Sequence, residues 1–193
     1  MDEPTVAVYE GHVEEWLARR GGPRDDLGER FRRHVGSGPV LDAGCGPGRY
    51  LGQLGRPVVG VDATAGLLAA ARRRADAPLV RGDLEALPFS EGVFAGVFAR
   101  HSYLHLRKEL LVPALRDAAR VLRPGGHLFL SLVRGSYEGR SLPGDDFPGR
   151  WFSCWEPGEL AAALAVAGFV HVEVEDGNGP RQSTDIYARA SAH

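Results

Sequence analysis

The chain has few cysteines. Only Cys45 and Cys154 occur among its 193 residues, and neither belongs to a CxxC pair. A disulfide framework needs several paired cysteines, and metal or redox sites of the CxxC type need that spacing, so both classes of protein are excluded. A reducing cytoplasm is the simplest location for a chain of this kind.

A basic excess and a long apolar run are also missing. The 23 basic residues face 25 acidic ones, and the net charge of −2 argues against a nucleic-acid binder with a strongly basic surface. Residues 1–10 have neither the basic start nor the apolar stretch of a signal peptide, and no run approaches about 18 apolar residues. We therefore expect no standard secretion signal, no membrane span and no nucleic-acid partner.

The chain does have the composition of one globular domain, with 44% hydrophobic and 25% charged residues. Short apolar runs alternate with segments of helical period. The expected strands cover residues 40–43, 57–61, 78–80, 93–99, 127–132, 170–174 and 184–190, and the expected helices cover 9–20, 27–35, 65–75, 110–122 and 156–168. Right-handed crossovers place helices on both faces of a parallel sheet. The sequence therefore predicts a single doubly wound, mostly parallel α/β domain over residues 1–193.

Two segments lie outside the alternation of strands and helices. Residues 1–36 precede the first strand and are expected to form two N-terminal helices. Residues 134–155 mix glycine, serine and arginine with five aromatic residues and show no clean period. We interpret this second segment as a long irregular insertion, and structureless stretches of that length are uncommon in a compact domain unless they bind something.

A glycine-rich turn follows the first strand. Residues 40–48 read VLDAGCGPG, and glycine at such a turn lets a ligand approach the backbone closely. The dinucleotide fingerprint GxGxxG would need a further glycine where Arg49 or Leu51 stands. A Walker loop would need Gly-Lys-Ser/Thr, which is absent. The spacing disfavours a nicotinamide cofactor and excludes ATP binding of the Walker type.

Acidic residues follow the next two strands. Asp62 can accept from both hydroxyls of a ribose, and Asp83 can accept from the amine of an adenine while Leu84 packs on its ring. A single aspartate after a strand is usually a turn residue or a helix cap. Here three aspartates, Asp42, Asp62 and Asp83, follow successive strands beside a glycine loop. One ligand that contains adenosine explains this arrangement better.

At this point four blocks resemble a known family. VLDAGCGPG, VVGVDA, RGDLEALPF and VLRPGGHLFLSL are similar to the signature blocks of class I S-adenosylmethionine-dependent methyltransferases and stand in the same order. The resemblance is close over residues 40–132. It implies a seven-stranded Rossmann-like sheet, with residues 184–190 as an antiparallel strand between the fifth and sixth, and S-adenosylmethionine as cofactor.

The resemblance also implies which residues hold the cofactor. They are Tyr9, Asp42, Gly44, Gly46, Gly48, Asp62, Ala63, Asp83 and Leu84. Asp42 would orient the glycine loop or the methionine amine, and the three glycines would line the methionine moiety. Asp62 would hold the ribose, and Ala63 with Asp83 and Leu84 would border the adenine. Tyr9, placed before the first expected helix, resembles a lid residue, and a core aromatic is the alternative.

Two histidines are candidate catalytic bases. Methyl transfer to a hydroxyl or a protonated amine requires loss of a proton, which a histidine with a pKa near 6.5 can accept. His101 and His105 follow the fourth strand, in the loop that faces the methyl group in the family resembled. Either could be the base, and a structural role is the alternative for each. Their spacing would permit zinc, but HExxH and nearby cysteines are absent, so we expect no metal.

The 134–155 segment is expected to build the acceptor pocket. Arg134, Arg140 and Arg150 could hold an anionic group, and Trp151 could pack on an apolar one; Arg150 and Trp151 are the predicted substrate-binding residues. The alternative is a solvated loop whose aromatics pack on the sheet.

We expect methyl transfer to oxygen or nitrogen of a small-molecule acceptor. A tRNA or protein acceptor, or a non-catalytic cofactor-binding module, is the alternative. The sequence names neither the acceptor nor the oligomeric state.

Overall fold

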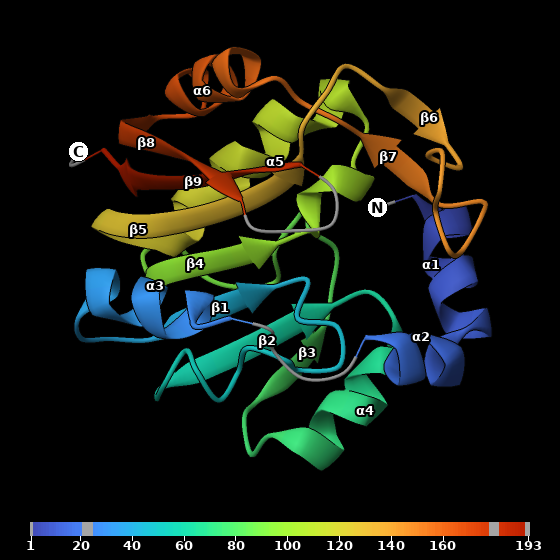
Figure 1. Ribbon diagram of the computed structural model, residues 1–193. Coiled ribbons are helices and arrows are strands. Elements are labelled where there is room, and N and C mark those ends of the chain that lie inside the picture. Colours follow the sequence, from blue (N-terminus) through green and yellow to red (C-terminus); the bar gives the residue numbers. More distant parts are fainter. Residues whose placement is uncertain (1, 21–24, 178–181, 192–193) are drawn as a thin grey trace.

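A computed structural model describes residues 2–20, 25–177 and 182–191. One seven-stranded sheet runs through it in the order β3-β2-β1-β4-β5-β9-β8 (Figure 1). Its strands are β1 Val40–Ala43, β2 Val58–Asp62, β3 Leu79–Arg81, β4 Phe94–Arg100, β5 Leu122–Val133, β8 Phe169–Gly177 and β9 Ser183–Ala190. All neighbours pair in parallel except β9, which is antiparallel to β5 and β8. The predicted doubly wound sheet and its one reversed strand are confirmed.

Helices cover both faces of the sheet. α3 (Leu27–Val35) lies on one face, and α5 (Lys108–Val121) and α6 (Pro157–Val166) lie on the other (Figure 1). Because successive side chains of a strand point to opposite faces, Val97 of β4 packs with α5 and α6 while Phe98 packs with α3. This burial on both sides explains why the central strands are apolar without alternation.

The strand order places a topological switch point between β1 and β4. The chain moves from β1 outward to β2 and β3, with α4 (Ala65–Arg74) as a crossover, and then returns to β4 on the other side of β1. The connections after β1 and β4 therefore leave in opposite directions. Ligands of open α/β sheets bind in the crevice at such a point, outside the carboxyl ends of the strands.

The N-terminal segment differs from the prediction. It forms three helices, because α1 (Glu3–Gly11) and α2 (Val13–Arg19) precede α3 where one helix over 9–20 was expected. Asp2 starts α1 by accepting a hydrogen bond from the Thr5 amide at 3.0 Å, a cap that the apolar spacing does not report. Tyr9 therefore lies inside the first helix, and its predicted place before that helix was wrong.

The insertion also differs from the prediction. Residues 134–155 contain a two-stranded antiparallel sheet of β6 (Glu138–Arg140) and β7 (Trp151–Ser153), so the segment is not irregular throughout. Strands of three residues are too short to show a period-2 pattern. The aromatic residues Phe147, Phe152 and Trp155 are buried, which anchors the hairpin to the rest of the domain.

The described ranges contain neither a membrane-spanning helix nor a metal-binding cluster. None of the helices there is long and apolar enough to cross a membrane. Within those same ranges, no cluster of three or more histidine, cysteine or acidic side chains is arranged to hold a metal ion.

Candidate active site

A cavity of about 230 Å³ opens at the carboxyl ends of β1, β2 and β4. The glycine loop after β1 forms one wall, and the turn that contains the 3₁₀ helix η1 (Tyr103–His105) forms another. Residues of α1 and of the 134–155 segment complete the enclosure. Segments that are far apart in sequence therefore meet at the switch point, as expected for a ligand site in this fold class.

The glycine loop is shaped by backbone geometry that other residues would not adopt. Gly44 has a φ of +78°, and a Cβ atom there would lie 2.2 Å from the Cβ of Ser102. Gly46 has a φ of +52°, and its amide donates to Oδ2 of Asp62 at 2.8 Å. Both glycines line the cavity. Gly48 instead lies against Leu51 and against Ala71 of α4, where a Cβ atom would come within 3.1 Å of both side chains.

Two carboxylates lie at the β1 and β2 side of the cavity. Asp42 is 3% exposed, and its Oδ2 has no hydrogen-bond partner among the residues that the structure describes. Burial, and then the nearby charge of Asp62, raise the pKa of Asp42 to about 8. Burial also raises the pKa of Asp62, although amide hydrogen bonds from Thr64 and Gly46 oppose that rise. A cationic group placed here would pair with Asp42 and restore its ionised form.

A second cavity of about 380 Å³ adjoins the first, and Ala63 and Asp83 line it. Its other wall is α1, from Glu3 to Glu10. Leu84 does not line it, because the side chain is fully buried in the core. The structure thus divides the predicted cofactor residues between two neighbouring cavities, with Leu84 and Gly48 in the supporting packing.

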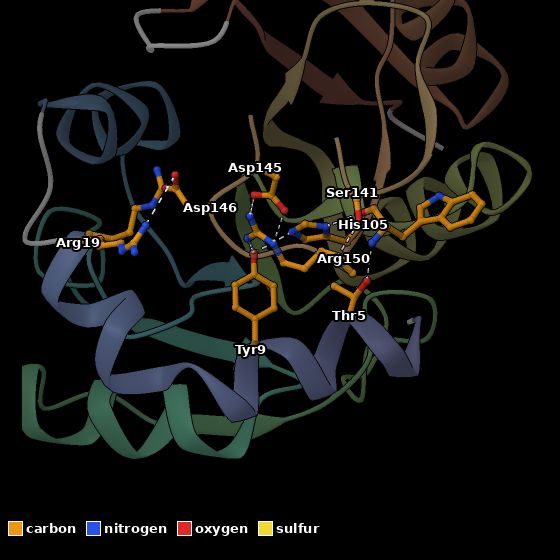
Figure 2. Close-up of polar contacts among 11 residues, drawn as sticks. Thr5, Tyr9, Arg19, His105, Ser141, Asp145, Asp146 and Arg150 are labelled. Carbon is orange, nitrogen blue, oxygen red and sulfur yellow. Dashed lines mark hydrogen bonds and ion pairs between the residues drawn. The ribbon is translucent and has the colours of Figure 1, made fainter. Parts of the chain in front are cut away.

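Arg150 connects the insertion to α1. Its guanidinium forms an ion pair with Asp145, and its Nη1 donates to the Tyr9 hydroxyl at 2.7 Å (Figure 2). Tyr9 in turn lies 2.8 Å from Nε2 of His105. Arg150 is buried and lines the cavity, as does Asp145. The predicted site residues Tyr9, His105 and Arg150 therefore form one hydrogen-bonded chain.

The partners of His105 fix its protonation state. Nδ1 lies 2.6 Å from the carbonyl oxygen of Trp151, which can only accept, so Nδ1 carries the proton. Nε2 is then the acceptor for the Tyr9 hydroxyl. Burial lowers the pKa of His105 to about 3. The hydrogen bond to Trp151 opposes this shift, and the charge of Arg150 adds to it. His105 is neutral, and both ring nitrogens are already occupied by protein partners.

His101 lines the same cavity as His105 but is exposed, whereas His105 is buried. The residue adopts a left-handed backbone conformation with a φ of +52°, and its amide donates to the Ser131 carbonyl at 3.0 Å. The ring is accessible from the cavity, whose walls enclose it. That enclosure, followed by the charges of Arg100, Arg20 and Arg49, lowers the pKa of His101.

Trp151 contributes to the site through its backbone. Its amide donates to Oγ1 of Thr5 at 2.8 Å, and its carbonyl oxygen accepts from Nδ1 of His105 at 2.6 Å. The indole ring is not part of the cavity wall; the guanidinium of Arg107 lies 4.5 Å from the ring centre, and that of Arg140 lies 5.7 Å from it. The structure thus places the predicted substrate-binding side chain of Trp151 outside the cavity.

Several cavity residues were not predicted. They include Arg20, Arg49, Arg100 and Asp145. Arg49 directly follows the glycine loop and Arg100 directly precedes His101, so adjacency to predicted residues was an available signal for both. Arg20 and Asp145 carry no such signal. Of the other arginines considered, Arg134 pairs with Glu156 and Arg140 with Asp2.

Comparisons with known proteins give the family. A family model described as a methyltransferase domain matches residues 41–130. A malonyl-[acyl-carrier protein] O-methyltransferase from Erwinia pyrifoliae is 34% identical over 182 residues, which cover 86% of this chain and 69% of that protein. The corresponding protein of Enterobacter lignolyticus is 40% identical over 102 residues, but the match covers only 40% of its length.

Solved structures show the same fold. The structure of a DhpI–SAH complex matches 99% of this chain and 97% of its own with a TM-score of 0.77 at 20% identity. The fold, the motif order and the Erwinia pyrifoliae relative agree, and the chain belongs to the family of S-adenosylmethionine-dependent methyltransferases.

Proposed function

We propose that the protein transfers a methyl group from S-adenosylmethionine to an oxygen or nitrogen of a small molecule. The observation that carries this proposal is the buried Oδ2 of Asp42 beside the glycine loop, which has no hydrogen-bond partner in the part of the chain that the structure describes. The cofactor has a primary ammonium group, and a carboxylate kept from water needs such a partner. When bound, S-adenosylmethionine supplies a methyl group on a positively charged sulfur.

The other cofactor residues fit the remaining parts of the same molecule. Gly44 and Gly46 line the cavity with backbone at positive φ, so this turn would present bare backbone to the methionine chain. Asp62 would hold the ribose, because each carboxylate oxygen that already accepts one amide hydrogen bond has a second acceptor position. The second cavity, with Ala63 and Asp83, would take the adenine.

A small acceptor is supported by the enclosure of the site. α1 and the hairpin residues close the cavity from two sides, which leaves no broad surface for a folded RNA at that point. Two relatives are named as O-methyltransferases of malonyl-[acyl-carrier protein] and of a fatty acid, which supports oxygen as the acceptor atom. A protein or tRNA acceptor remains the alternative, as does a cofactor-binding module without catalysis.

The two candidate bases differ in the surroundings of their rings, which supports one over the other. A base must be within hydrogen-bond reach of the acceptor and have a free lone pair. Nε2 of His105 already accepts from Tyr9, so His105 acts here as a docking point for α1. His101 faces the cavity and is the better candidate if the acceptor carries a proton. An acceptor that arrives deprotonated would need neither histidine.

Calorimetric titration with S-adenosylhomocysteine tests the proposal. The wild type should bind, and Asp62→Ala should weaken binding by about 1.5 to 3 kcal/mol, the range for hydrogen bonds to a charged group. Asp76→Ala is the matched control, because its side chain is 96% exposed in a surface ion pair with Arg56 and lies outside both cavities. Absence of binding by the wild type, or tighter binding of NAD, would refute the assignment. Binding without turnover on any acceptor would favour the non-catalytic module.

A further inference from the structure

Besides the Arg150–Asp145 ion pair and His105, three arginines and His101 line the cavity that holds Asp42 and Asp62. Arg20 follows α2, Arg49 follows the glycine loop, and Arg100 and His101 stand where β4 ends. The three guanidinium groups all act on the pKa of His101, so they surround the same part of the cavity. Three segments of the chain thus deliver positive charge to one region, and no role in holding the cofactor has been assigned to it.

Arg20 and Arg100 each pair with a carboxylate outside the cavity lining, and Nη1 of Arg100 also donates to the hydroxyl of Tyr50, which lines the cavity. Arg20 pairs with Asp146 at 2.7 Å, and Arg100 pairs with Asp25 at 3.1 Å. A guanidinium has five N–H donors, so one carboxylate partner does not satisfy it. The buried Nε of Arg100 has no hydrogen-bond partner among the described residues. These contacts fix Arg20 and Arg100 and leave N–H donors of both for an anionic ligand.

Acidic and basic side chains therefore come from different parts of the cavity wall. Asp42 and Asp62 stand where β1 and β2 end, whereas Arg20 follows α2, Arg100 ends β4, and Arg49 follows the glycine loop. Apolar wall residues, Leu104, Val133 and Phe152, complete the lining. A bidentate arginine is the residue of choice for a carboxylate, and the apolar wall suits a carbon skeleton attached to it.

The two histidines point to the same class of acceptor. His105 has no free nitrogen, and a proton placed on His101 would be repelled by three arginines. The site is thus poorly equipped to remove a proton from a neutral acceptor. An anionic oxygen has no proton to lose and is attracted by the same arginines.

We propose that the acceptor is a carboxylic acid, bound as its carboxylate by Arg20, Arg49 and Arg100, and that the product is its methyl ester. This inference rests on the proposed function. A carboxylate oxygen supplies the electron pair of the new C–O bond, and the electrons of the broken C–S bond stay on sulfur. The charges of the carboxylate and the sulfonium disappear together, and no proton moves.

The test uses the complex of the protein with saturating S-adenosylhomocysteine. Acetate, hexanoate and benzoate are titrated into it beside acetamide, hexanamide and benzamide, which have the same skeletons without the charge. Binding of at least one carboxylate and of none of the amides is expected. Arg100→Gln and Arg20→Gln should each weaken carboxylate binding about tenfold to a hundredfold, the range for a lost hydrogen bond to a charged group. Arg20 is the second variant because its partly exposed position makes misfolding no concern.

The results distinguish an arginine cluster that binds the acceptor carboxylate from one that binds the carboxylate of the cofactor. Arg30→Gln is the control, since Arg30 also forms an ion pair, with Glu175, but does not line the cavity. If the arginine variants instead weaken S-adenosylhomocysteine about tenfold, the cluster holds the methionine carboxylate and the inference is overturned. Equal affinity for carboxylates and amides overturns it as well. Failure of the wild type to bind S-adenosylhomocysteine would be a failure of the proposed function, and is seen before any carboxylate is added.

Discussion

Binding of the cofactor product should depend on pH through Asp42. In the free protein, burial and the charge of Asp62 raise the pKa of Asp42 to about 8, so the carboxyl carries a proton at neutral pH. An ammonium group bound beside it would favour the ionised form and return the pKa to its ordinary range. Binding therefore releases a proton, and affinity increases as pH rises. Because the pKa of Asp62 is also raised, the two carboxyls titrate as a pair.

The expected magnitude follows from the two protonation states. With a pKa of about 8 in the free protein and an ordinary value in the complex, the association constant should rise about fiftyfold from pH 6 to pH 8, or about 2.3 kcal/mol. The same shift acts on folding with the opposite sign. The native free protein holds a proton that the unfolded chain has lost, so its stability should fall as pH increases from about 4 to about 8.

Calorimetry of S-adenosylhomocysteine binding at several pH values measures the first effect. Buffers with different ionisation enthalpies give the number of protons released. Asp42→Asn is the control, because it keeps the shape of the side chain and removes its titration. Equal affinities of the wild type at pH 6 and pH 8, or the same pH dependence in Asp42→Asn, would show that Asp42 does not receive the ammonium group.

Three substitutions test the lid and the loop. Tyr9→Phe leaves Arg150 without one acceptor and should lower the free energy of unfolding in urea by about 1 to 3 kcal/mol; no change would mean that water replaces the hydroxyl. Gly44→Ala places a methyl group against Ser102 and should abolish S-adenosylhomocysteine binding, and retained affinity would contradict the close approach at this turn. Glu10→Ala removes the carboxylate that caps α4, and stopped-flow dissociation of the ligand should be faster, whereas an unchanged rate would exclude Glu10 as a lid anchor.

The part of the site that the sequence predicts is the part built by consecutive βα units. Asp42, Gly44, Gly46 and Asp62 lie within 21 positions of one another, and parallel strands bring their carboxyl ends to one edge of the sheet. The local sequence pattern is then sufficient to predict these site residues, because the type and order of the strands fix the position of each turn. The hydrogen bond from the Gly46 amide to Asp62 joins two turns that the topology alone had already placed side by side.

The part that the sequence does not predict is assembled by long-range polar contacts. Tyr9 and His105 are 96 positions apart, and the Trp151 amide meets Thr5 across 146 positions. Periodicity reports which face of an element is apolar, and it is silent about hydrogen bonds between elements. The tautomer of His105 is an example of what the sequence cannot predict, since it depends on a carbonyl of β7 that no motif marks.

These polar contacts explain how a closed site can admit its ligands. Of the nine residues of α1, all of which the structure describes, only Thr5 is buried. The helix is held by side chains at both its ends, from the ion pair of Asp2 with Arg140 to the hydrogen bonds of Glu10 with the first amides of α4. Water can replace each of these contacts, whereas withdrawal of α3 would expose Phe31 and the aromatic cluster around it. Opening of α1 therefore costs little apolar burial, and this helix, which walls both cavities, is the element through which ligand exchange is expected.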